Sequence, residues 1–313
     1  MTVAGWRLAS IDLGTNTVRL LVVEAERAGA WRVLDQDQTV TRLGEGLASR
    51  GCLGGEPMAR TRAVVSAYLA RARRAGAGDV RIVATSAVRE AANGPDFCAA
   101  LEAIGAAVQV VSGEDEARLT LLGIVRGLGW PGGPLLAFDI GGGSTEFVLA
   151  ADGRVVASAS LRLGVVGLAE QYQFPRAVDW PRYRELEQLV RGRLVAELPP
   201  AIRRAGAREL VGTAGTVTAL AALDLDLTRY DAGRVHGHRL PRAVVERLRD
   251  RLGALTVEER AALPCLEPGR ADLIVPGVAI TLTALDVIGA DAVVVSDWGL
   301  REGILAEALE GHR

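Results

Sequence analysis

Two segments of this 313-residue chain place an aspartate beside a polar, glycine-containing turn between two apolar runs. The first reads Ile11-Asp12-Leu13-Gly14-Thr15-Asn16-Thr17, and the second reads Phe138-Asp139-Ile140-Gly141-Gly142-Gly143-Ser144-Thr145-Glu146. An apolar run on each side of such a turn predicts a β-hairpin. Because glycine lacks a Cβ, an anion can reach the backbone N–H groups, and the hydroxyl and amide side chains add donors. The pair of turns therefore favours phosphate binding, although either turn alone could be only a hairpin.

Arginine is the side chain that would complete such a site, because its planar fork meets two phosphate oxygens at once. Arg19 follows the first turn, and Arg89 follows a strand expected at 80–84. A third segment, 212–216, is also rich in glycine and threonine, and we expect it to form a loop. The residues expected to contact phosphate are Gly14, Thr15, Asn16, Arg19, Arg89, Gly141, Gly142, Gly143, Ser144, Gly215 and Thr216.

Carboxylates beside a phosphate site repel the ligand unless a cation lies between them. Asp12, Asp139 and Glu146 are placed in this way. We expect them to bind Mg²⁺ or Mn²⁺, since magnesium sites commonly use one or two protein carboxylates. A second acidic cluster, residues 114–116, stands where a strand gives way to a helix. It could be only a charged helix start, or it could orient and deprotonate a water for attack on phosphorus.

The composition excludes several classes of enzyme and partner. All 36 basic residues are arginine, so the chain has no lysine for a P-loop, a protein kinase or a pyridoxal Schiff base. A net charge of −2 argues against a nucleic-acid partner, and no uncharged apolar stretch is long enough to span a membrane. The three cysteines have no metal or redox spacing, so we expect a cytoplasmic protein.

The repeat extends beyond the turns, because Arg-Leu-Gly recurs at 42–44 and 162–164. A repeat this long indicates two similar domains, which we place at 1–125 and 126–298. Strands and helices alternate, which indicates an α/β fold. Besides the second hairpin, strands are expected at 6–13, 17–25, 31–41, 80–84, 108–111, 209–212 and 292–296. Helices are expected at 57–74, 95–104, from 112 onward, and at 180–205, 241–253, 270–289 and 300–309.

The chain resembles the Ppx/GppA family of exopolyphosphatases and guanosine pentaphosphate phosphohydrolases, within the superfamily of actin and the sugar kinases. The resemblance covers nearly the whole chain and depends on several ordered motifs. Besides the two turns, these include Ala84-Thr85-Ser86-Ala87-Val88-Arg89, Ser112-Gly113-Glu114-Asp115-Glu116-Ala117-Arg118, Gly269-Arg270-Ala271-Asp272 and Trp298-Gly299-Leu300-Arg301-Glu302-Gly303. The resemblance implies two ribonuclease-H-like (actin-like) domains with the active site in an interdomain cleft, and a final helix within 299–313 that packs on the first domain.

The resemblance also implies roles for single residues. Glu116 matches the family's catalytic base. Asp139 and Glu146 match residues associated with the metal and the attacking water, and Asp12 fits the same acidic set. Arg19, Arg89 and the backbone of 141–144 match phosphate contacts.

The activity that the resemblance implies is hydrolysis of a terminal phosphoanhydride by metal-assisted attack of water. Inorganic polyphosphate is the substrate we expect, and the resemblance does not separate it from guanosine pentaphosphate. An actin-like ATPase and a non-catalytic sensor of polyphosphate or nucleotide are two functions that the resemblance favours less. We expect neither a nucleic acid nor a membrane as a partner, and a homodimer is a possible assembly.

Overall fold

The structure of the chain, a computed structural model, describes residues 5–26, 29–130 and 132–311. The chain divides into two compact units. Unit 1 comprises residues 1–126 and 299–313, and unit 2 comprises residues 127–298. Across the described residues, none of the helices combines the length and the apolar character needed to cross a membrane.

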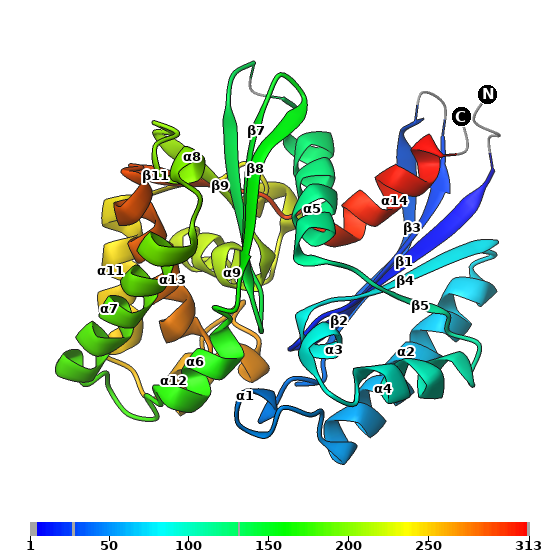
Figure 1. The fold of residues 1–313 in the computed structure, drawn as a ribbon, viewed down its shortest axis with the longest axis horizontal. Helices are drawn as coiled ribbons and strands as arrows, with labels where there is room; N and C mark the ends of the chain where they lie inside the picture. Colours follow the sequence, from blue (N-terminus) through cyan, green and yellow to red (C-terminus); the bar gives the residue numbers. More distant parts are fainter. Residues whose placement is uncertain (1–4, 27–28, 131, 312–313) are drawn as a thin grey trace. The chain divides into compact units, whose positions relative to one another are not determined.

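Unit 1 is built on a five-stranded sheet in the order β3-β2-β1-β4-β5 (Figure 1). The first three strands of the chain pair antiparallel, whereas β4 and β5 continue the sheet in parallel with β1. The strands are β1 (Arg7–Leu13), β2 (Thr17–Ala25), β3 (Trp31–Val40), β4 (Asp79–Ala84) and β5 (Val108–Val110). The helices are α1 (Leu47–Arg50), α2 (Gly55–Arg74), α3 (Ser86–Glu90), α4 (Gly94–Glu102), α5 (Gly113–Leu128) and α14 (Leu300–Glu310).

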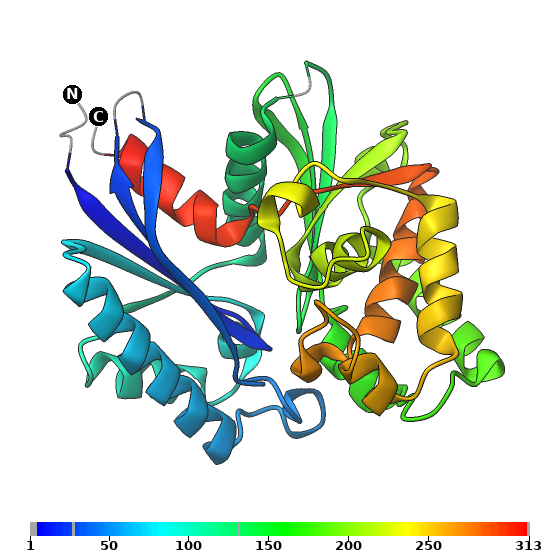
Figure 2. The same cartoon turned by 180° about the vertical axis from the view of Figure 1, so that it is seen from behind.

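The strands β1 and β2 have apolar side chains on both faces of this sheet, and helices cover each face and bury them. On one face, α2 and α4 pack over a core that includes Ile11 and Leu20. On the other face, Leu305 and Leu309 of α14 pack against Leu8, as Figures 1 and 2 show for the helix as a whole. Full burial of one such leucine contributes about 1.5–3 kcal/mol, so α14 is held firmly on unit 1.

Unit 2 repeats this plan. Its sheet has the order β10-β11-β9-β6-β7-β8. Read from β8 to β11, the strands have the same order and the same directions as β3 to β5 of unit 1, and β10 is added antiparallel at the edge. The two sheets confirm the predicted α/β fold with two similar ribonuclease-H-like domains.

The elements of unit 2 surround a single large core. The strands are β6 (Leu135–Ile140), β7 (Thr145–Ala151), β8 (Arg154–Leu161), β9 (Glu209–Thr213), β10 (Arg239–Pro241) and β11 (Ala292–Val295). The helices are α6 (Val165–Gln171), α7 (Trp180–Glu197), α8 (Pro200–Arg203), α9 (Ala214–Asp224), α10 (Ala232–Val235), α11 (Arg242–Gly253), α12 (Val257–Ala261) and α13 (Ile274–Ile288), with a 3₁₀ turn at Pro268–Arg270.

One expectation about these elements is wrong, and two others differ from the structure only in their bounds. The loop predicted at 212–216 is absent, because β9 leads directly into α9 and places Gly215 and Thr216 in the first helical turn. The helices predicted near 180–205 are α7 and α8, which are separated at Pro199 and Pro200 because proline lacks the N–H group that would continue a helix. The helix predicted near 270–289 is α13, which begins at Ile274 after the 3₁₀ turn.

Candidate functional site

The turn between β1 and β2, residues 12–17 (turn 1), is closed by a hydrogen bond from the Gly14 amide to the Thr17 carbonyl at 3.1 Å. The segment that follows β3 holds it from behind. The Gly44 amide donates to the Thr15 carbonyl at 2.8 Å, and the amides of residues 41 and 42 donate to the Asn16 carbonyl, both at 2.9 Å. A Cβ on Gly44 would lie 2.2 Å from Thr15 Cγ2, so glycine at this position makes room for the Thr15 side chain. This contact explains the first Arg-Leu-Gly motif.

The side chains of turn 1 are buried and polar. Thr15, Asn16 and Thr17 are each between 5% and 7% exposed. Asn16 donates from Nδ2 to Thr17 Oγ1 at 3.3 Å, but its Oδ1 has no hydrogen-bond partner. A buried amide oxygen without a partner costs free energy, and a ligand that supplied a donor or a cation would remove that cost. Turn 1 is thus prepared for a polar ligand.

Asp12 lies at the end of β1 in this turn and is 6% exposed. Burial raises the pKa of its carboxyl above the ordinary value, and the nearby positive charges of Arg19 and Arg301 only partly oppose this. Arg19 is directly opposite on β2, with Nη1 3.8 Å from Asp12 Oδ2. The aspartate of turn 1 is therefore faced by a cation supplied by the chain itself.

Two further predicted residues of unit 1 are in direct contact. Arg89, in the last turn of α3, donates from Nη1 to Glu116 Oε2 at 2.9 Å and to the Val111 carbonyl at 3.0 Å. Glu116 lies in the first turn of α5 and is 8% exposed. Since a guanidinium has five N–H donors, Arg89 can orient this carboxylate and still offer Nη2 to a phosphate.

Burial separates Glu116 from the other carboxylates of its cluster. Glu114 and Asp115 are exposed, and Asp115 accepts from the Ser112 hydroxyl at 2.8 Å in the manner of an ordinary helix start. For these two residues, the charged helix start is the better interpretation. Glu116 is the member of the cluster that is held inside the fold.

Close backbone packing fixes the helix that carries Glu116. A Cβ on Gly123 of α5 would lie 2.0 Å from the Gly299 carbonyl oxygen, and one on Gly303 of α14 would lie 1.8 Å from that of Leu119. The two helices therefore cross at a distance that only glycine permits. This gives a structural reason for the glycines of the motif at 298–303.

The turn between β6 and β7, residues 139–146 (turn 2), is closed in the same way, by the Gly141 amide and the Ser144 carbonyl at 2.9 Å. Here the segment behind the turn begins α6, and the amides of Val165 and Val166 donate to the carbonyls of residues 141 and 142. A Cβ on Gly164 would lie 2.3 Å from the Gly142 carbonyl oxygen. The second Arg-Leu-Gly motif thus supports turn 2 as the first supports turn 1.

The two carboxylates of turn 2 face each other across the hairpin. Asp139 pairs with Glu146 in the register of β6 and β7, so both side chains lie on one face of the sheet. Glu146 is 2% exposed and accepts from the Ser160 hydroxyl at 2.6 Å. Like charges directly opposite each other in a sheet are destabilising, and a bound cation would relieve the repulsion.

The start of α9 adjoins this pair. Asp139 is also in register with Thr213, the last residue of β9, and Gly215 and Thr216 follow in the first turn of the helix. Ala214 has φ of 68°, a left-handed conformation that costs an alanine about 1 kcal/mol or more. Such local strain is typical of functional sites.

Arg270 is a candidate site residue to which the sequence motifs assigned no role. A Cβ on Gly215 would lie 1.4 Å from Arg270 Nη1, so the guanidinium rests on the first turn of α9. Its Nε donates to Glu267 Oε2 at 2.6 Å. Gly277 of α13 packs in the same way on Thr216, with 2.5 Å from a Cβ to Thr216 Oγ1. The motif that begins at Gly269 therefore supports the start of α9, and Arg270 supplies the positive charge there.

The donor set suits a hard divalent cation. Asp12 belongs to unit 1, whereas Asp139 and Glu146 belong to unit 2. In the part of the chain that the structure describes, no three His, Cys, Asp or Glu residues form a group that could hold a metal ion. Two oxygen ligands from turn 2 are nevertheless enough for magnesium, which usually keeps several waters or takes substrate phosphates as its other ligands.

Comparisons with known proteins agree on the family. The sequence matches the Ppx/GppA phosphatase family over residues 22–312. It is 36% identical to exopolyphosphatase 2 of Mycobacterium tuberculosis, over 95% of this chain and 97% of that protein. It is 31% identical to exopolyphosphatase 1 of Mycobacterium leprae, over 98% of this chain and 90% of that protein.

Solved structures give the same result. An exopolyphosphatase from Cytophaga hutchinsonii has a TM-score of 0.91 and 26% identity, covering 97% of this chain and 98% of that one. The Ppx/GppA family member of Aquifex aeolicus has a TM-score of 0.83 and 30% identity, covering 98% and 99%. The chain therefore belongs to the Ppx/GppA phosphatase family.

Proposed function

We propose that this protein is an exopolyphosphatase that releases the terminal phosphate of inorganic polyphosphate by attack of water. The full-length similarity to proteins named exopolyphosphatase supports the substrate. The observation that carries the chemistry is the buried Glu116 carboxylate, oriented by Arg89 at 2.9 Å. An oriented carboxylate that receives a proton from water is what hydrolysis of a phosphoanhydride requires.

In this proposal each unit contributes groups that bind phosphate oxygens. In unit 1 they are the backbone amides of turn 1 with Arg19 and Arg89, and in unit 2 they are the backbone amides of turn 2 with Arg270. Glu116 takes the proton of the attacking water. Positioning and charge stabilisation supply most of the rate in phosphoryl transfer, so the binding groups contribute as much as the base.

A divalent cation, Mg²⁺ or Mn²⁺, completes the proposal. Asp139 and Glu146 would hold it, and Asp12 belongs to the same acidic set. When bound, it would neutralise charge on the phosphoryl group. The side chains of turn 2 fit such an ion because they are oxygen donors that face one another.

The test is phosphate release by the purified protein with Mg²⁺, measured on long-chain polyphosphate, guanosine pentaphosphate and ATP side by side. We expect release from polyphosphate to exceed release from both nucleotides. A preference for guanosine pentaphosphate would replace the proposed substrate with the alarmone and keep the same site. No release from any of the three by folded protein would overturn the proposal.

The cellular location and the oligomeric state remain predictions. We propose a cytoplasmic location because the three cysteines are all free thiols. A homodimer remains a prediction, which light scattering at micromolar concentration would test.

A further inference from the structure

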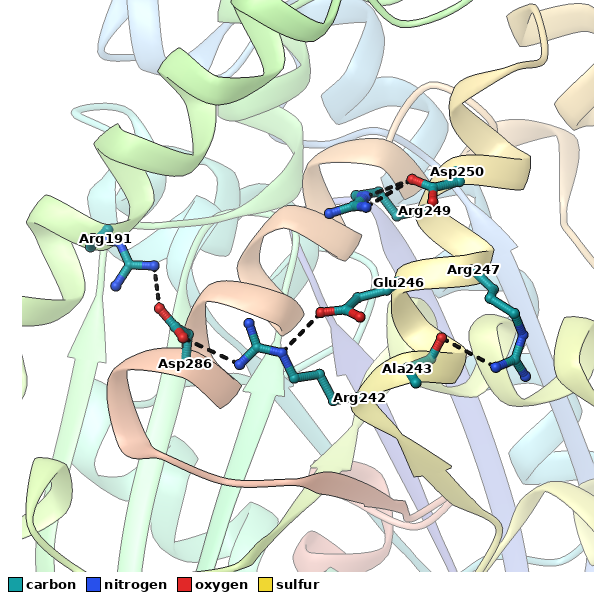
Figure 3. Close-up of polar contacts among 8 residues, drawn as sticks. All are labelled: Arg191, Arg242, Ala243, Glu246, Arg247, Arg249, Asp250 and Asp286. Carbon is teal, nitrogen blue, oxygen red and sulfur yellow. Dashed lines mark hydrogen bonds and ion pairs between the residues drawn. The ribbon is translucent and has the colours of Figure 1, made fainter.

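A groove lined by arginines lies on unit 2, among α7, α11 and α13. Figure 3 shows three of these arginines, Arg191, Arg242 and Arg249, with their carboxylate partners. Its volume is about 230 Å³. Four guanidiniums line it, those of Arg184 and Arg191 from α7 and those of Arg242 and Arg249 from α11. We call these four residues and the hollow between them the arginine groove.

The spacing of the four arginines is regular. Each helix contributes two arginines seven residues apart, which is two helical turns or about 10.5 Å along the axis. Residues seven apart lie on one helix face, so the groove has a row of positive charge on each side. A linear polyanion with a repeating charge matches two such rows better than a compact anion does.

The acidic residues that line the groove leave a formal excess of one positive charge. Asp286 of α13 pairs with both Arg191 and Arg242, the latter at 3.2 Å, and Glu246 accepts from Arg242 Nε at 3.0 Å. Glu187 is the third lining carboxylate, which leaves four guanidiniums against three carboxylates. Burial raises the pKa of Glu187, although three surrounding arginines oppose the shift.

Most of the N–H donors in the groove are uncommitted. Each guanidinium carries five. Arg191 and Arg242 give one and two of them to the carboxylates above, and Arg249 pairs with Asp250 outside the groove at 2.9 Å. Within the described residues, Arg184 makes neither a hydrogen bond nor an ion pair. The uncommitted donors and the hollow between the helices leave room for an anion to bind.

We propose that the arginine groove is an accessory binding site for the phosphate oxygens of a condensed phosphate chain, at a distance from the reacting phosphate. The inference rests on the proposed function for the identity of the polyanion. Helix α13 links the two regions, since Gly277 packs on Thr216 at its start and Asp286 lies nine residues later, about 14 Å along the axis. A long chain can reach both regions, and a short one cannot.

The test compares two double variants with the same change in charge. Arg191→Gln with Arg242→Gln removes two groove arginines. The control, Arg193→Gln with Arg247→Gln, removes two arginines of the same helices outside the groove; Figure 3 shows Arg247 directed to the Ala243 carbonyl. For the groove variant we expect KM for long-chain polyphosphate to rise about fivefold, with kcat and the KM for tripolyphosphate unchanged. The control should match the parent protein on both substrates.

A second variant keeps the test possible if the double variant does not fold. Arg184→Gln breaks no hydrogen bond or ion pair among the described residues, so it should keep the parent melting temperature and raise the long-chain KM by about twofold. Direct binding of long-chain polyphosphate to the parent and groove variants, by calorimetry without Mg²⁺, separates this inference from the proposed function. Weaker binding by the groove variant supports the site even where no phosphate is released.

Three outcomes would overturn the inference. They are equal long-chain KM values for groove and control variants, an equal rise for short and long substrates, and binding of inorganic phosphate in the groove with no dependence on chain length.

Discussion

Turn 1 and turn 2 share a backbone and differ in charge. Both are closed by a hydrogen bond across the hairpin, and a glycine of an Arg-Leu-Gly motif packs behind each. In register with the aspartate, however, turn 1 has Arg19, whereas turn 2 has Glu146. The same hairpin therefore carries a neutral pair in unit 1 and two carboxylates in unit 2. The difference indicates that the Arg19 side chain adapts turn 1 to an anion, whereas the paired carboxylates adapt turn 2 to a cation.

Neutralising the charged residue that lies opposite each aspartate in its hairpin should affect activity most. Glu146→Gln removes one of two facing carboxylates, so we expect kcat to fall by about 100-fold or more and the Mg²⁺ concentration for half-activity to rise. Arg19→Gln should instead raise KM for polyphosphate and leave the Mg²⁺ requirement unchanged. Phosphate release over a Mg²⁺ titration measures both. Equal Mg²⁺ dependence in the two variants would contradict the assignment of the cation to turn 2.

The supporting glycines should differ in how well a methyl group is tolerated. Gly164→Ala places its Cβ 2.3 Å from backbone atoms of turn 2, and Gly44→Ala places it 2.2 Å from a methyl of Thr15. Backbone cannot yield as a side chain can, so Gly164→Ala should cost about 3 kcal/mol of unfolding free energy and Gly44→Ala less.

The companion substitution Thr15→Ser sharpens this prediction, because it deletes the obstructing methyl and keeps the hydroxyl. The double variant Gly44→Ala with Thr15→Ser should recover most of the lost stability in urea unfolding. Failure of the rescue would show that Gly44 has a role other than making room for Thr15.

Arg270 can be displaced without being mutated. Gly215→Ala would put a Cβ 1.4 Å from Arg270 Nη1, so the guanidinium must move away from the start of α9. We expect kcat/KM for polyphosphate to fall about tenfold, the size of one charge-assisted contact. Gly192→Ala, which has nothing within 4 Å of its Cβ, is the matched control. An unchanged kcat/KM would remove Arg270 from the phosphate contacts.

The smallest expected effect is on stability and concerns Asp12. Its pKa is raised by burial, so the ionised carboxylate is less favourable in the folded protein than in the unfolded chain. With respect to this carboxyl, the folded protein is most stable below the unfolded pKa of 3.8, where the group is protonated in both states. That stability is lost as the pH rises through the higher folded pKa. Asp12→Asn should therefore have a higher Tm than the parent at pH 7, and the difference should shrink as the pH falls toward 4. A lower Tm at pH 7 would contradict the burial argument.

Local pattern was enough to predict the hairpins and the polar residues at their turns. Apolar runs around Gly14 and Gly141 indicate where each strand ends, and the structure places the turns there. The family resemblance selected Glu116 from its cluster, but the physical reason is its burial, which depends on how α5 packs. In the sequence all three are equally acidic.

What the sequence did not predict depends on contacts between distant segments. Arg270 reaches Gly215 because α13 packs on α9, and no spacing rule brings these residues together. The contact between Arg89 and Glu116 likewise requires α3 and α5 to start at neighbouring strands. The interpretation of 212–216 as a loop failed because its glycine serves close packing inside a helix, rather than a turn.

The role of Glu116 as the base is tested most directly by Glu116→Gln beside Glu114→Gln, two neutralised carboxylates of one cluster. Glu116 is buried and bonded to Arg89, whereas Glu114 is exposed. We predict that Glu116→Gln lowers the rate of phosphate release from polyphosphate by at least about 1,000-fold while the Kd for polyphosphate stays within about threefold, and that Glu114→Gln behaves as the parent. Turnover retained by Glu116→Gln, with Mg²⁺ saturating, would contradict the assignment of Glu116 as the base.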